Sequence, residues 1–193
     1  MPNWCENDLR IYGTYDDDDN ETGIHLIKEI TDLLESDKPT LLSYMKKMPK
    51  ELEGTTKTSG TMTLTPDDGR NTKDEQVKTS AELIKLYGAD NWYDWNIQNW
   101  GTKWDVHEPS IFIQDTNQIG LRFMTAWSPP IKIMNEFYND NNEVLPEMIL
   151  HYWEEGMGYT GHWQNGRHNE GNTQGIFDRR ALMDTIMSEA KSK

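Results

Sequence analysis

The residues from Lys103 to His107 place a cation, a carboxylate and an imidazole at every second position of a short stretch. If this stretch is a strand, Lys103, Asp105 and His107 share one face, because side chains alternate along a strand. Trp104 and Val106 then point to the other face. A carboxylate and an imidazole can transfer protons, and a lysine can stabilise negative charge. The pattern indicates either the polar wall of a binding pocket or the active groups of an enzyme that acts on a nucleotide or nucleic acid.

Tryptophans surround this stretch, and five of the eight in the chain lie between Asn91 and Pro130. Aromatic faces can stack on a base or a sugar, and Gly101 lets the backbone approach a ligand closely. The simpler interpretation is that these tryptophans are core, since buried aromatic side chains pack more often than they bind. Arg122, on a returning strand, would join Lys103 in contacting an anion. We predict no catalytic residue, and the predicted ligand-binding residues are Asn99, Trp100, Lys103, Trp104, Asp105, His107, Arg122 and Trp127.

Other catalytic and metal-binding patterns are incomplete. Ser128 precedes two prolines, which predicts a helix cap rather than a nucleophile, and Cys5 has no base at a suitable spacing. The residues from Asp18 to Glu29 match the spacing of a calcium-binding loop, but the preceding segment alternates like a strand, whereas such loops follow a helix. The histidines lack the close spacing of zinc ligands. We therefore predict no metal site and no cofactor.

The composition indicates a folded and acidic protein. Its 193 residues include 19 lysines and arginines against 33 aspartates and glutamates, and the formal net charge is −14. This charge argues against direct binding to nucleic acid or to an anionic membrane, and it suits a basic partner or mimicry of DNA. A single cysteine, with no signal peptide or long apolar run evident, predicts a cytoplasmic protein without a membrane span.

Apolar periodicity predicts the helices and strands that would position these residues. Strands are expected at residues 1–13, 38–49, 103–113, 121–127, 148–154 and 159–163. Helices are expected at residues 22–36, 72–88, 131–138 and 177–190. The second helix is expected to begin at a capping box of Thr72 and Glu75, and to bury one face formed by Val77, Ala81, Ile84 and Tyr87. Residues 50–71 and 166–175 are expected to be polar loops.

Strands and helices alternate without regular βαβ spacing, which favours an α+β fold over a doubly wound sheet. The expected architecture is a mainly antiparallel sheet with helices on one face. Its last β-β-α-β part matches the rear of a split βαβ, ferredoxin-like arrangement. We expect one domain over residues 1–165, with the polar loop and final helix of 166–193 packed on it.

Three sequence strings resemble those of one family. MPNWCENDLRIYG at 1–13, WYDWNIQNWGTKWD at 92–105 and TAWSPP at 125–130 are similar to the YubB-type (Api-like) ferredoxin-like proteins of phages and plasmids. The resemblance spans roughly residues 1–165, where much of the agreement is in element order alone. It implies a cytoplasmic protein of a mobile element with a ferredoxin-like domain, and it implies no particular catalytic mechanism.

These observations lead to one main functional expectation and two alternatives. The main expectation is a non-catalytic binding protein that acts on a host component, in counter-defence or host takeover. Its partner would be a host protein or a small nucleotide-like ligand near Trp100 to Trp127. The first alternative is an enzyme acting on a nucleotide or nucleic acid. The second is an acidic DNA mimic, although the carboxylates concentrate at Asp16–Asp19 and in scattered loops rather than in rows.

Overall fold

The computed structural model describes residues 3–14, 22–55 and 79–172. Within these ranges the chain forms an α+β structure, as predicted, and its sheet is six-stranded and fully antiparallel. The strand order is β2-β3-β1-β4-β5-β6. The strands are β1 (Trp4–Tyr12), β2 (His107–Asp115), β3 (Gln118–Ala126), β4 (Glu147–Glu154), β5 (Tyr159–Gln164) and β6 (Arg167–Asn172).

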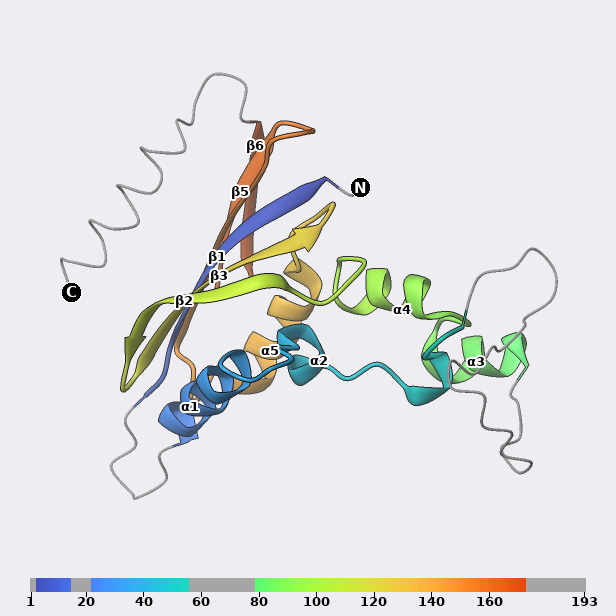
Figure 1. The fold of residues 1–193 in the computed structure, drawn as a ribbon, viewed down its shortest axis with the longest axis horizontal. Coiled ribbons are helices and arrows are strands. Elements are labelled where there is room, and N and C mark those ends of the chain that lie inside the picture. The colour runs from blue at the N-terminus through green and yellow to red at the C-terminus, as the bar shows by residue number, and fades with distance from the viewer. Residues whose placement is uncertain (1–2, 15–21, 56–78, 173–193) are drawn as a thin grey trace.

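The helices cover one face of the sheet. Figure 1 shows α1 (Thr22–Leu34), α2 (Leu41–Met45) and α5 (Ile131–Asn141) on the same side, whereas α3 (Ser80–Tyr87) and α4 (Trp92–Asn99) extend away from it. A short 3-10 helix, η1 (Lys50–Leu52), follows α2. The predicted arrangement of helices on one face of an antiparallel sheet therefore holds for these segments.

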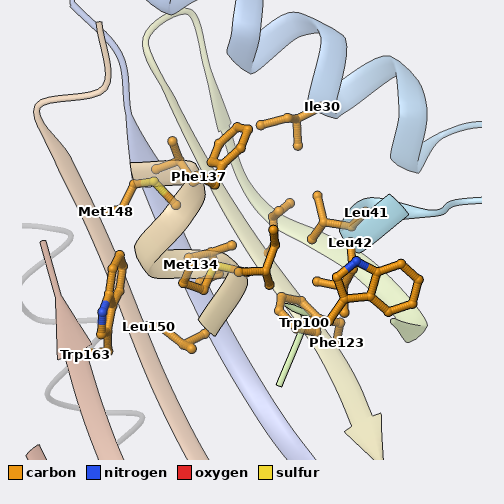
Figure 2. Close-up of a cluster of buried hydrophobic side chains, with 14 of the residues drawn as sticks. Ile30, Leu41, Leu42, Trp100, Phe123, Met134, Phe137, Met148, Leu150 and Trp163 are labelled. Atoms are coloured by element: carbon orange, nitrogen blue, oxygen red, sulfur yellow. The ribbon is translucent and has the colours of Figure 1, made fainter. Parts of the chain in front are cut away.

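The core lies between this sheet face and the helices. In β1, Leu9 is fully buried and is the direct register partner of Leu121 in β3 and of Leu150 in β4. Three leucines on adjacent strands thus form a row on the core face of the sheet. α1 supplies Ile27 and Ile30 to the same core. Figure 2 shows these strands and helices meeting in one apolar cluster, which includes Ile30, Leu41, Leu42, Trp100, Phe123, Met134, Phe137, Met148, Leu150 and Trp163.

The opposite face of the sheet carries a row of polar residues. Residues in direct register on antiparallel strands face the same side, and one such row crosses all six strands. We call it the polar row; from β2 to β6 it consists of Ser110, Arg122, Asp8, His151, His162 and Asn169. His151 shares this face with Ile149 and Trp153, on the side of the sheet opposite to the core.

Two elements differ from the sequence prediction before residue 90. The segment 38–49 was expected to be extended, but residues 41–45 form α2. The helix ending at Gly88 is present, and Gly88 closes it in the left-handed conformation with φ 77°. Its capping box consists of Thr79 and Glu82, and its buried residue is Leu83. Of the predicted apolar face, Tyr87 packs against the core, whereas Ala81 and Ile84 are exposed. Thr72, Glu75 and Val77 lie outside the described residues.

Three further differences follow residue 90. The tryptophan-rich stretch begins with a helix, α4, which apolar alternation did not predict. Residues 101–105 form bends and not a strand, so β2 starts only at His107. The stretch expected to be a polar loop after residue 165 contains β6, because backbone pairing with β5 needs no apolar side chains. The predicted helix at 177–190 lies outside the described residues.

Candidate functional site

The first residue of β1 and the first residue of β2 bring two aromatic rings together. Trp4 is on the sheet face opposite to the core, since its neighbour Cys5 is fully buried. The imidazole of His107 stacks on the Trp4 indole, with ring centroids 4.7 Å apart and an interplanar angle of 13°. The Trp104 ring lies 6.4 Å from Trp4 at 42°. Three aromatic rings from separate segments thus meet at the start of β2.

Lys103 extends this group toward α4. Its Nζ lies 4.3 Å from the centroid of the Trp104 ring and 5.6 Å from that of Tyr93. Both distances are within the range in which an aromatic face attracts a cation. We call Trp4, Tyr93, Lys103, Trp104 and His107 the aromatic cluster.

The aromatic cluster is open to solvent. Tyr93 is 42% exposed and Trp104 is 39% exposed, and the His107 side chain is 50% exposed. Large aromatic side chains are normally buried in the core, and those that gather on a surface often mark an interaction site. The exposure of Trp104 therefore makes this region a candidate interaction site, and it is stronger evidence for one than the nearby charged groups are.

Two of the predicted binding residues belong to the supporting structure instead. Trp100 is buried to 4% exposure, and its indole nitrogen donates a hydrogen bond of 2.9 Å to the carbonyl of Lys46. Its ring also packs edge-on against Trp95, at 5.7 Å and 84°. The amide of Asn99 donates to the Trp95 carbonyl at 2.9 Å. Trp100 therefore holds α4 on the core, whereas the Asn99 side chain bonds within α4.

Asp105 also has a structural role. Its carboxylate accepts backbone N–H bonds from Leu42 at 2.8 Å, from Ser43 at 2.9 Å and from Val106 at 2.8 Å. Leu42 and Ser43 lie in the first turn of α2, where backbone donors have no partner within the helix. The expectation that Lys103, Asp105 and His107 share one strand face was wrong, since the strand begins after Asp105.

Arg122 lies in the polar row, where it pairs with Asp8 of β1. Nε and Nη2 contact the two carboxylate oxygens at 2.8 and 3.2 Å, and the Asp8 side chain is 1% exposed. This hydrogen-bonded carboxylate raises the pKa of Arg122 further. Arg122 was expected to join Lys103 in contacting an anion. In the structure its guanidinium pairs with the Asp8 carboxylate, because Asp8 stands directly opposite Arg122 in the β1–β3 register.

Trp127 lies in the turn that follows β3. Its ring is 43% exposed, and its backbone has φ 74°, a left-handed conformation that is uncommon for a residue with a side chain. Its N–H donates to the Asn3 carbonyl at 2.9 Å. Ser128 was predicted to cap the following helix, but its hydroxyl donates to the Gly101 carbonyl at 2.7 Å, and Pro130 precedes α5 without a side-chain cap. Ser128 therefore ties the turn to the loop that leads to Trp104.

Sequence reasoning missed two members of the aromatic cluster. Trp4 carried a usable signal, because it is a large apolar residue on the same strand face as Glu6, Asp8 and Arg10. Tyr93 carried none, since its position next to Lys103 depends on the path of α4.

A second group of polar side chains lies on the helix side of the sheet. The Tyr152 hydroxyl and His168 Nε2 are 2.6 Å apart, beside a hollow of about 260 Å³ that Tyr159, Lys132 and Glu170 also line. Burial, followed by the nearby Glu170 charge, raises the pKa of Tyr152. Tyr152 is fully buried, whereas His168 is exposed, and the contact between the two side chains links β4 to β6.

Comparison of the chain with family models, with curated proteins and with solved structures found no match in any of the three. Among the described residues, no helix has the length and apolarity needed to cross a membrane.

Proposed function

We propose that this chain is a non-catalytic binding protein of a phage or plasmid that acts on a host component, and that the aromatic cluster contacts this component. The resemblance of the three sequence strings supports the origin, and with it a place in the host cytoplasm. The order β4-β1-β3-β2, with helices following β1 and β3, supports the finer assignment to a ferredoxin-like arrangement.

One observation carries the proposal. Trp104 is 39% exposed and Tyr93 is 42% exposed, although both rings contact Lys103 and the Trp104 ring also contacts Trp4. Tryptophan and tyrosine contribute much of the binding energy at protein interfaces, because they bury a large area with little loss of side-chain freedom. A surface of this kind suits a protein partner.

The charge of the chain favours the same class of partner. A net charge of −14 attracts a basic protein and repels the phosphates of a nucleotide. The partner is therefore a host protein with a basic surface, rather than the nucleotide-like ligand that the tryptophans also allow.

Capture from a host lysate, followed by affinity measurement with the purified partner, tests this proposal. Trp104→Ala should weaken binding by roughly thirtyfold, which corresponds to the loss of an interface residue worth about 2 kcal/mol. Leu86→Ala is the matched control, because Leu86 is 57% exposed on α3 and lies outside the cluster. Full affinity in a folded Trp104→Ala variant would remove the cluster from the binding surface.

The enzyme alternative makes a different prediction. His107 Nε2 lies 3.4 Å from a carboxylate oxygen of Glu108, and the Asp105 carboxylate is occupied by backbone donors. Turnover of a nucleotide that disappears in a folded His107→Ala variant would replace the binding proposal with catalysis.

A further inference from the structure

Two histidines face each other on the sheet surface opposite to the helices. His151 of β4 and His162 of β5 are direct register partners in the polar row. Their ring centroids are 4.8 Å apart, with an interplanar angle of 35°. The two residues are 11 positions apart in the sequence, and the β4–β5 hairpin brings them together.

Each of the two imidazole rings, when neutral, has a nitrogen lone pair that can bind a metal ion. Each histidine is half-buried, and within the described part of the chain neither imidazole has a hydrogen bond or an ion pair. A neutral imidazole binds a metal ion through a nitrogen lone pair that lies in the plane of the ring.

We propose that His151 and His162 together bind a divalent first-row transition-metal ion of the class that prefers imidazole nitrogen, such as Zn²⁺ or Ni²⁺. Metal–nitrogen bonds of about 2.0–2.1 Å place two nitrogen ligands of one ion roughly 3 Å apart. Facing rings with centroids 4.8 Å apart reach that separation by side-chain rotation alone. The site is independent of the aromatic cluster, and its existence does not depend on the proposed function.

Charged groups of both signs lie near His151. Asp8 stands opposite His151 in the polar row, and its carboxylate is shared with Arg122. Arg10 is close enough to His151 to oppose a positive charge. Among the described residues no group of three His, Cys, Asp or Glu side chains is placed to hold a metal, so water completes the coordination and the ion exchanges readily.

Titration calorimetry of the full chain with ZnCl₂ and with NiCl₂ tests the site. Wild-type protein should bind one ion, and His151→Gln and His162→Gln should each weaken binding by roughly tenfold or more, as loss of a ligand requires. His25→Gln is the matched control, because His25 is exposed on α1, on the other side of the sheet, and should leave binding unchanged.

A direct measurement on wild-type protein avoids reliance on variants that fail to fold. In protein labelled with ¹⁵N at histidine, ring-nitrogen resonances of His151 and His162 should shift together on addition of Zn²⁺, while those of His25 stay in place. Absence of saturable binding would overturn the proposal. So would binding that is equal in all three variants, or ring shifts at any other histidine alone.

Discussion

Cys5 shows how the position of one residue decides its chemistry. It is fully buried in β1, and burial raises the pKa of its thiol to about 12, with a further contribution from the Glu154 charge. The thiolate is the nucleophilic form of cysteine, so a protonated thiol reacts slowly.

We therefore expect native Cys5 to resist alkylation by iodoacetamide at pH 8, and the same protein in urea to react as fast as free cysteine. The folded thiol holds its proton above the ordinary pKa of 9.0, whereas the unfolded thiol loses it there. The contribution of Cys5 to stability is consequently complete below pH 9 and is lost as the pH rises toward 12. Mass spectrometry of timed samples measures the reaction, and equal rates in the native and urea-treated protein would contradict the prediction.

At the scale of elements, the loop that carries Trp104 depends on Asp105. Asp105→Ala should lower the free energy of unfolding by about 2 kcal/mol or more, because three backbone donors lose a charged acceptor. Urea unfolding measures the change. Glu108→Ala, at an exposed carboxylate in the neighbouring strand, is the control and should change stability by less than about 0.5 kcal/mol.

The packing of Tyr152 against β5 depends on the absence of a side chain at Gly161. A Cβ at this position would overlap the Tyr152 hydroxyl, because the Tyr152 side chain crosses β5 on its way to His168. Gly161→Ala should therefore destabilise the protein by about 1–3 kcal/mol, as overpacking does. Gly171→Ala has room, with the nearest atom 4.0 Å away, and should have little effect on the melting temperature. A similar loss in both variants would point to strand propensity rather than to the Tyr152 contact.

These elements also show what the sequence could and could not predict. Strong alternation in β1 and β3, and helical periodicity in α1 and α5, predicted where these elements lie. α4 and β6 were missed, because α4 has no clear apolar face and β6 has hardly any apolar residues. The aromatic cluster was found in part, since Lys103, Trp104 and His107 are close in sequence. Its contacts with Trp4 and Tyr93 depend on tertiary structure.

For the whole molecule, the continuity of the core predicts one cooperative unfolding transition. Trp100 holds α4 and α2 in the same apolar cluster as Trp163 of β5, so the helices cannot detach without exposing the sheet. Unfolding curves from tryptophan fluorescence and from far-ultraviolet circular dichroism should coincide. Two separated midpoints would indicate that α3 and α4 unfold as an independent unit.

The central place of β1 has a consequence for synthesis of the chain. Its hydrogen-bonding partners are β3 and β4, and Asn7 lies 116 residues before its contact Phe123. At about 5–20 residues per second, the ribosome needs on the order of 10 s to synthesise the residues between Asn7 and Phe123. Throughout this time the two hydrogen-bonding edges and the apolar face of β1 have no partner in β3 or β4. The nascent chain is thus exposed to aggregation and to chaperone binding before its central strand can pair.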